Sequence, residues 1–407
     1  MTTPIVGNLT RSASKRARST NSSRSGTPTP VTKSLKTQES LVDVSVPAFL
    51  RQSANEIRTK FQDLECRQLL RIAEGRRDPA SNWTQDTTKQ TRLRNRYVNV
   101  QPWDKSRIRL QVPPGESDYI NASPITLEDP RTGVVSSYIA AQGPKQTGLS
   151  HFWHMIWQQT SDVAVIVMLT QTAESGREKC FQYFPLDQQT VVISIDPVDP
   201  AESAPAGSVR SSEVYFDQAS RSTIRKLLLT FGDESKVVWH MLFSGWPDFE
   251  VPQKEDRAAL FELLRLSAQK NPEPSNPRII HCSAGVGRSG SFIALEYLLA
   301  QIESGAIADI TDEEDPIYDV VNRLREQRMM MVQGDAQYAF LYEVIWEQFL
   351  KSQHAQQATG VEEMASDIRA TLGEETTGDK GTDQTNNLID SDHAGHGTEE
   401  GKAPLTS

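Results

Sequence analysis

The apolar residues of this 407-residue chain gather in its middle section, where they follow two periods. Apolar positions at helical spacing, which predict two amphipathic helices, are Phe49, Leu50, Ile57, Phe61, Leu64 and Leu69. The valine-rich run 162–169 predicts a strand covered on both faces, and 227–231 with 236–243 predicts a strand pair. Further helices are predicted over 252–270, 289–303, 316–328 and 335–350. Strands interleaved with helices indicate an α/β domain.

The two ends of the chain differ from the middle in composition. Residues 1–40 hold seven basic residues and one acid, whereas residues 352–407 hold eleven acids and three basic residues. Segments with so few apolar residues bury too little surface to offset the entropy of ordering. We therefore predict a disordered Ser/Thr-rich segment over 1–43, a folded domain over 44–352 and a disordered acidic tail over 353–407. A short helix inside that tail would be lined by Val361, Met364, Ile368 and Leu372.

Charge and cysteine usage narrow the class of protein. The net charge of −10 argues against a nucleic-acid partner, which would require a dominant basic face. The cysteines Cys66, Cys180 and Cys282 form no disulfide or zinc framework, so a reducing compartment fits best. The sequence contains no run of about 18 apolar residues, so we predict no membrane span. We expect a soluble, monomeric, cytoplasmic protein. The basic stretch at 15–18 is a weak signal for either nuclear import or docking, and the first of these would add a nuclear location.

One segment carries a definite chemistry, because an apolar strand at 278–281 leads into a glycine-bearing loop and then a helix. The sequence of residues 278–290 is Arg-Ile-Ile-His-Cys-Ser-Ala-Gly-Val-Gly-Arg-Ser-Gly. Small residues let successive backbone N–H groups turn inward as an anion-binding nest, and the helix adds its positive N-terminal end. Cys282 at the base of the nest would be a stabilised thiolate and a nucleophile. The loop residues expected to hold phosphate are Ser283, Ala284, Gly285, Val286 and Gly287.

Three neighbours of Cys282 have predicted roles. Arg288 closes the loop, where its planar fork can hydrogen-bond two phosphate oxygens. Ser289 is placed to hydrogen-bond the sulfur of Cys282 and so make it a better leaving group. His281 is expected to order the loop by hydrogen bonding to the backbone rather than to act as acid or base.

The motif His-Cys-Ser-Ala-Gly-Val-Gly-Arg-Ser-Gly after an apolar strand resembles that of the tyrosine-specific, cysteine-dependent protein phosphatases of the non-receptor kind. The resemblance covers roughly residues 46–350. It implies a highly twisted mixed sheet flanked by helices, with the Cys-x5-Arg phosphate-binding loop at the end of a strand. It also implies hydrolysis of phosphotyrosine in proteins through a phosphocysteine, in intracellular signalling and without a metal or other cofactor.

Two further segments are similar to family loops that complete the reaction. Gly245-Trp246-Pro247-Asp248 resembles the mobile loop of the family, and this makes Asp248 the proton donor to the leaving phenolate. The segment 327–338 resembles the one that positions the hydrolytic water, with Gln333 as first choice and Gln337 as second.

Two other segments resemble loops that shape the cleft. Residues 95–97 and 118–123 are similar to the phosphotyrosine-recognition loop and its supporting strand, so Tyr97 would wall a cleft too deep for phosphoserine. Residues 174–180 resemble a loop in which Glu174 pairs with Arg288 and Lys179 contacts the segment of the proton donor.

The chain departs from the family pattern at three positions. Asn99 replaces a common aspartate that accepts hydrogen bonds from the substrate backbone, and an uncharged acceptor predicts lower peptide affinity. Glu250 replaces a glycine after the catalytic loop, which predicts slower or biased closure. Gly334 replaces a threonine, and the polar stretch 186–222 is predicted to be a surface excursion.

Two other functions remain open from the residues alone. A non-catalytic phosphotyrosine-binding module would not need Cys282, Arg288, Asp248 and Gln333 together. A phosphatase of broader specificity, acting on phosphoserine, phosphothreonine or lipid phosphate, would not need the wall at Tyr97. The expected partners are phosphotyrosine-containing proteins, signalling kinases among them.

Overall fold

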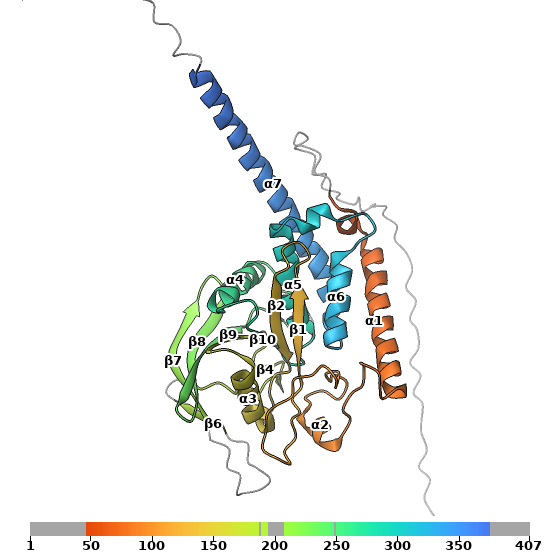
Figure 1. Ribbon diagram of the computed structural model, residues 1–407, viewed down its shortest axis with the longest axis vertical. Coiled ribbons are helices and arrows are strands. Elements are labelled where there is room, and N and C mark those ends of the chain that lie inside the picture. Colours follow the sequence, from red (N-terminus) through yellow and green to blue (C-terminus); the bar gives the residue numbers. More distant parts are fainter. Residues whose placement is uncertain (1–45, 187–188, 194–206, 248–249, 375–407) are drawn as a thin grey trace, which may run out of the picture. The chain divides into compact units, whose positions relative to one another are not determined.

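Eight strands form one twisted mixed sheet in the part of the chain that the structure describes (Figure 1). The computed structural model describes residues 46–186, 189–193, 207–247 and 250–374. The strands, in their order across the sheet, are β1 (Ala122–Glu128), β2 (Val135–Ala141), β10 (Arg278–His281), β3 (Val163–Met168), β9 (Glu234–Phe243), β8 (Ser222–Phe231), β7 (Gly207–Asp217) and β6 (Thr190–Ile193). A separate small hairpin consists of β4 (Ala173–Glu174) and β5 (Arg177–Glu178).

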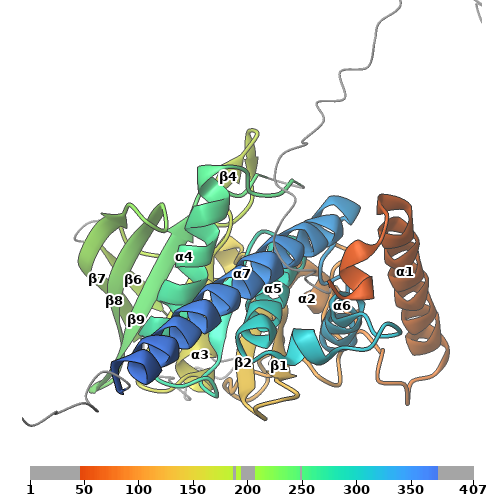
Figure 2. The same ribbon diagram turned by 90° about the horizontal axis from the view of Figure 1, so that it is seen from above.

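Helices cover both faces of this sheet. The helices are α1 (Ala54–Arg77), α2 (Lys89–Arg94), α3 (Leu149–Gln159), α4 (Glu255–Lys270), α5 (Gly287–Glu303), α6 (Pro316–Gln327) and α7 (Asp335–Glu374), with single 3-10 turns at Ala48–Arg51, Gln146–Gly148 and Ala306–Asp309. Helix α3 packs on the face that carries Ala164, Ile166 and Met168 of β3. Figure 2 shows α4, α5 and α7 together on one side of the sheet. In the described ranges, no helix is long and apolar enough to cross a membrane.

Local sequence explains where the helices begin. Ser53 and Glu56 form a capping box at the start of α1, in which each side chain hydrogen-bonds the backbone N–H of the other residue. Asp315 caps α6 by accepting from two backbone N–H groups, and Pro316 occupies the first turn, where its missing N–H is not needed.

Parallel pairing at the centre of the sheet positions the site. Strand β10 lies between β2 and β3 and runs parallel to both, with Ile280 opposite Ala140 on one side and Val167 on the other. All four residues of β10 are buried. Because the carboxyl ends of parallel strands meet at one edge, the segments after Ala141, Met168 and His281 converge there. Leu169 N–H donates to His281 O at 2.8 Å and closes this edge.

The predicted α/β fold is confirmed, and so are most of its elements. The strand predicted over 162–169, the second strand of the pair and the helices predicted over 252–270, 289–303 and 316–328 are present with bounds shifted by three residues or fewer. The first strand of the pair, predicted from 227, begins earlier, at Ser222. The last helix was predicted to end at 350 but continues to Glu374. It therefore takes in the segment that we expected as a separate short helix.

Two predictions about elements are wrong. The stretch 186–222 is more than a surface excursion, because it contains the strands β6 and β7. Few residues of these two strands face the core, so the sequence shows no apolar alternation there. Leu69 is 67% exposed in a single continuous α1. The buried stripe of that helix is completed instead by Gln68, which accepts from Met330 N–H, and by Arg71, which donates to Asn322.

Some predictions concern residues outside the described ranges. These include the disorder of 1–43, the part of the predicted disordered tail 353–407 that follows Glu374, the basic signal at 15–18 and the position of Asp248. The first part of that tail, 353–374, is helical, so the prediction of disorder is wrong there.

Candidate active site

The loop between β10 and α5 surrounds a buried cysteine. Cys282 is 5% exposed, and its Sγ accepts a hydrogen bond from Gly285 N–H at 3.3 Å. Gly285 has φ +71°, and a Cβ at this position would lie 2.1 Å from Ala141 O. Only glycine fits this turn, which directs a backbone N–H at the sulfur. Helix α5 begins at Gly287, so the positive end of its dipole also faces the loop.

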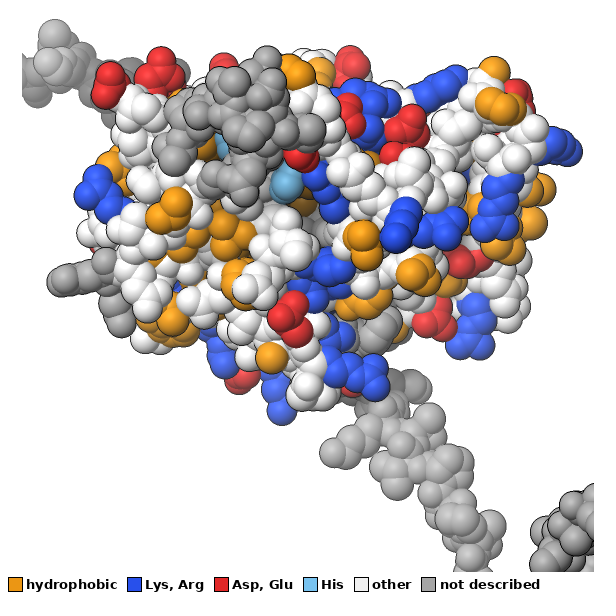
Figure 3. Space-filling model, turned by 90° about the horizontal axis from the view of Figure 1, so that it is seen from below, with side chains coloured by type: hydrophobic (Ala, Val, Ile, Leu, Met, Phe, Trp, Pro, Cys, Tyr) orange, Lys and Arg blue, Asp and Glu red, His pale blue; other side chains and the backbone are white. Residues whose placement is uncertain are grey.

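A cavity of about 460 Å³ opens over this loop. Its lining combines the loop with three other segments and consists of Arg96, Tyr97, Asn99, Val100, Arg177, Glu178, Lys179, Cys282, Ser283, Ala284, Gly287, Arg288, Gln333 and Gln337. Four of these side chains are basic and one is acidic, which favours an anionic ligand. Groups of Lys and Arg side chains are also visible on the molecular face shown in Figure 3.

Arg288 is held by a carboxylate on the β4–β5 hairpin. Its Nη1 and Nη2 each donate to one oxygen of Glu174 at 2.7 Å, and Nη1 also donates to Leu169 O at 3.0 Å. Burial alone would raise the pKa of Glu174, but its hydrogen bonds with Arg288 and the charge of that guanidinium lower the pKa below its ordinary value. The pair therefore stays ionised, and the guanidinium plane has a fixed direction.

Tyr97 forms one wall of the cavity through a directed hydrogen-bond chain. Ser283 Oγ donates to Lys179 O at 2.8 Å, and a carbonyl can only accept. Tyr97 OH, 2.8 Å from Ser283 Oγ, must therefore be the donor of that second bond. This contact ties the wall to the residue that follows Cys282.

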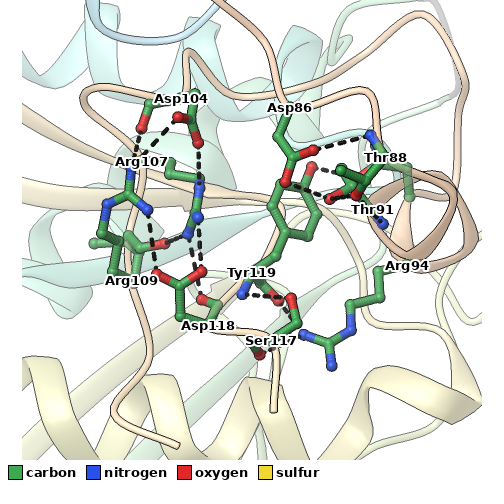
Figure 4. Close-up of polar contacts among 12 residues, drawn as sticks. Asp86, Thr88, Thr91, Arg94, Asp104, Arg107, Arg109, Ser117, Asp118 and Tyr119 are labelled. Atoms are coloured by element: carbon green, nitrogen blue, oxygen red, sulfur yellow. Dashed lines mark hydrogen bonds and ion pairs between the residues drawn. The ribbon is translucent and has the colours of Figure 1, made fainter. Parts of the chain in front are cut away.

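A polar network supports the segment that carries Tyr97. Figure 4 shows its outer part, in which Arg107 and Arg109 contact Asp104 and Asp118 close to Tyr119. Asn95 Oδ1 accepts from Tyr119 OH at 2.6 Å and from Asn121 Nδ2 at 2.9 Å. Arg94 Nη1 donates to Ser117 O at 2.9 Å and to Tyr119 O at 2.7 Å. The short helix α2 is thereby fastened to the chain entering β1.

His281 is a fully buried, neutral group behind the loop. Its Nδ1 lies 3.2 Å from Cys282 O, and its Nε2 lies 2.7 Å from Tyr183 OH. Burial lowers the pKa of His281 to about 4. The imidazole is thus uncharged near neutral pH and contacts the backbone of the cysteine, the position that the sequence predicts for it.

The comparisons with known proteins agree with this geometry. A family model described as protein-tyrosine phosphatase matches residues 91–347. The chain is a member of the protein-tyrosine phosphatase family. Tyrosine-protein phosphatase 2 of Schizosaccharomyces pombe is 38% identical over 258 residues, which are 62% of this chain and 33% of that protein. The mouse (Mus musculus) tyrosine-protein phosphatase non-receptor type 4 is 32% identical over 257 residues, which are 62% of this chain and 24% of that protein.

A solved structure supports the same assignment. The catalytic domain of human protein tyrosine phosphatase non-receptor type 18 is similar with a TM-score of 0.60 and 26% identity, over 74% of this chain and 99% of that domain. The chain spans about a third or less of the length of the curated relatives named above.

Ten of the sequence-predicted site residues line the phosphatase cavity. They are Cys282, Ser283, Ala284, Gly287, Arg288, Tyr97, Asn99, Gln333, Gln337 and Lys179. Gly285 and Val286 belong to the loop itself, and Glu174 acts on the cavity through Arg288. Both glutamines lie beside the loop, since a Cβ on Gly287 would be 2.9 Å from Gln337 Oε1 and 3.4 Å from Gln333 Cβ.

One predicted contact is wrong, and others fall outside the described residues. Ser289 Oγ is buried without a hydrogen-bond partner among the described residues, so it does not donate to Cys282, whose described donor is Gly285. Asp248 lies outside the described ranges, and with it the predicted contact of Lys179. Next to that gap, Trp246 Nε1 donates to Glu250 O at 3.0 Å.

The prediction from sequence missed the role of Arg328, which orders the loop between β10 and α5 by hydrogen bonding to its carbonyls. The side chain is fully buried; its Nε donates to Gly285 O at 2.8 Å and its Nη2 donates to Ala284 O at 3.1 Å and Asn121 Oδ1 at 2.7 Å. Burial lowers the pKa of Arg328 to about 10, which still leaves it charged at neutral pH. By taking up the loop carbonyls, it leaves the loop N–H groups to face the cavity. Its only signal in the sequence is its place in the segment of Gln333.

The cavity-lining Arg96 was also missed. It donates to Gly143 O at 3.1 Å, Pro144 O at 2.8 Å and Glu178 Oε1 at 3.0 Å. These bonds join the Tyr97 segment to the chain after β2 and to the β4–β5 hairpin. No local pattern identifies such a residue, because its partners, mostly backbone carbonyls, are brought together only by the fold.

Proposed function

We propose that this chain hydrolyses phosphotyrosine in proteins through a phosphocysteine intermediate. The observation that carries the proposal is the arrangement at Cys282. A backbone N–H points at its sulfur, and the paired guanidinium of Arg288 lies on the same cavity wall. A sulfur anion and a phosphate dianion repel each other in water, and such a set of fixed donors stabilises both together.

In the first step the thiolate of Cys282 forms a bond to phosphorus while the bond from phosphorus to the tyrosine oxygen breaks. Arg288 and the loop N–H groups hold the equatorial oxygens of the transferring group. The leaving phenolate takes a proton from Asp248, a role that rests on the sequence alone. In the second step a water oriented by Gln333, with Gln337 beside it, loses a proton to Asp248 and attacks phosphorus. Inorganic phosphate leaves and the thiolate is restored.

The wall at Tyr97 supports selection for tyrosine. Its hydroxyl is hydrogen-bonded to Ser283, so the ring is fixed at the side of the cavity. A phosphorylated phenol can extend past such a wall to the loop, whereas phosphoserine and phosphothreonine are too short. We extend the proposal to phosphorylated signalling proteins, kinases among them, as substrates of a monomeric cytoplasmic enzyme.

Phosphate release from matched substrates tests this function. The purified chain should hydrolyse a phosphotyrosyl peptide at least a hundredfold faster than the same peptide with phosphothreonine, and faster than a phosphoinositide. Cys282→Ser should abolish release. A module that only binds would show no turnover in the parent protein, and comparable rates on phosphothreonine or lipid would favour a broader phosphatase.

Trapping tests the substrate class. Asp248→Ala should retain phosphotyrosyl proteins from a cell extract, because it removes leaving-group protonation without removing the phosphate site. Release of those proteins by vanadate, which occupies the same site, is the control for specific capture.

A further inference from the structure

Three buried polar groups form a line from the backbone of Cys282 across the core of the sheet. His281 on β10 lies 2.7 Å through its Nε2 from Tyr183 OH, and the same hydroxyl lies 3.0 Å from Nε2 of His240 on β9. All three residues are 0% exposed. His240 is two strands away from β10, since β3 lies between them.

The carbonyl at the end of the line fixes the direction of every hydrogen bond in it. Cys282 O can only accept, so His281 Nδ1 carries the proton and donates to it at 3.2 Å. His281 Nε2 is then unprotonated and accepts from Tyr183 O–H. The Tyr183 oxygen is left to accept from His240 Nε2–H. His240 Nδ1 has no partner among the described residues, as is tolerable for an unprotonated nitrogen in this tautomer.

The surroundings keep both imidazoles neutral and exclude water. Burial, and then the charge of Arg225 on β8, lower the pKa of His240 well below its ordinary value. Arg225 itself stacks over Phe184, whose ring lies 4.5 Å from that of His240. The other ionisable groups that act on the line are Arg96, beside His281, and Cys180, beside Tyr183.

A buried histidine at position 240 would destabilise the fold relative to an apolar residue if packing were its only role. Its neighbours Val238 and Met241 fill core positions with apolar side chains, and a buried imidazole must recover the hydrogen bonds that it loses to water. The described bond that His240 makes is its donation to Tyr183. This single directed bond is what an apolar residue at 240 would remove.

We propose that His240 is a positioning residue for the nucleophile, acting through Tyr183 and His281 on the carbonyl of Cys282. Donation by His240 strengthens the next donor in the line, because hydrogen bonds in a chain polarise one another in a low dielectric. The carbonyl of Cys282 is thereby held by a strong donor, with its negative end turned from the sulfur. The inference rests on the proposed function, in which the Cys282 thiolate attacks phosphate.

The test is the pH dependence of alkylation at Cys282, measured with iodoacetamide and quantified on the Cys282 peptide by mass spectrometry, because the exposed Cys66 also reacts. His240→Phe keeps an aromatic ring against Phe184 but cannot donate. Tyr183→Phe breaks the line in the middle. His240→Gln supplies an amide donor, and His154→Gln removes a histidine that packs on Phe231, outside the line.

The midpoint of alkylation should rise by about 0.5 pH unit in His240→Phe and in Tyr183→Phe, the size expected for one hydrogen bond. It should return toward the parent value in His240→Gln and stay unchanged in His154→Gln. On a phosphotyrosyl peptide, kcat should fall about threefold in His240→Phe with KM unchanged.

An unshifted midpoint in folded His240→Phe overturns the proposal, and a shift in Tyr183→Phe alone would end the line at Tyr183. If His240→Phe does not fold, Tyr183→Phe still tests whether the line reaches Cys282, because it removes the donor to His281 and the acceptor of His240, and an unshifted midpoint there also overturns the proposal. Failure of the proposed function is a separate result, since it would appear as full activity in Cys282→Ser.

Discussion

Glu174 and Arg288 meet edge to edge, with each carboxylate oxygen 2.7 Å from a different terminal nitrogen of the guanidinium. The two residues are far apart in sequence, and the hairpin that carries Glu174 turns through Ser175 and Gly176, both with positive φ. This turn geometry suits a two-residue hairpin loop. The small hairpin thus serves to hold the arginine in the plane that a phosphate needs.

Replacing Glu174 should weaken catalysis without removing the phosphate site. Glu174→Gln keeps the shape but loses the charge, so Arg288 is no longer fixed in one direction. We expect kcat/KM for a phosphotyrosyl peptide to fall roughly tenfold, which corresponds to about 1.4 kcal/mol. Glu178→Gln, on the same hairpin but with a 57% exposed side chain, should change it less than twofold. Equal losses in the two variants would contradict the role of the pair.

Removing the buried guanidinium of Arg328 should disorder the loop. Arg328→Lys cannot reach Gly285 O, Ala284 O and Asn121 together, so loop carbonyls lose their donors. We expect the free energy of unfolding to fall by about 3 kcal/mol and kcat at least tenfold. Urea unfolding and steady-state kinetics measure these. Arg323→Lys, in the last part of α6, removes a single side-chain bond to Tyr297 on α5, and as the matched control it should change stability by less than about 1 kcal/mol.

Buried His281 should make stability depend on pH in a defined direction. Its folded-state pKa is about 4, below its ordinary value of 6.5. As pH falls from 6.5 to 4 the unfolded chain takes up a proton that the folded chain refuses, so the free energy of unfolding decreases. His281 accounts for at most about 3 kcal/mol of this loss. Urea unfolding between pH 4.5 and 7 should give a smaller slope in His281→Gln, and an unchanged slope would rule out this contribution.

Restoring a carboxylate at position 99 should improve peptide binding. Asn99 lines the cavity, where a charged acceptor would form stronger hydrogen bonds with the substrate backbone. In Asn99→Asp we expect KM for a phosphotyrosyl peptide to fall about fivefold, corresponding to roughly 1 kcal/mol. KM for para-nitrophenyl phosphate, which has no peptide backbone, should not change. A parallel fall for both substrates would point to a general effect of charge instead.

The residues of the Cys282 loop could be predicted because they are contiguous. A buried strand, a glycine that must adopt positive φ and a helix start follow one another within a few residues, and local geometry then turns the N–H groups inward. The central strand and the helices were likewise predictable, since each shows a period of its own. By contrast, β7 lies near the sheet edge with exposed residues along most of its length, so its strand has no hydrophobic pattern.

Tertiary structure alone decided which side chains support that loop. The partners of Arg328 and Arg96 are mainly backbone carbonyls, and every residue has one, so no residue type marks them in the sequence. The bond from Gly285 rather than Ser289 to the sulfur also depends on a rotamer and a turn, not on spacing. The chain by itself determined the kind of chemistry, because a thiol, a guanidinium and small residues must be adjacent to build a nest. The three-dimensional packing determined how firmly those groups are held, because hydrogen bonds between distant segments exist only after folding.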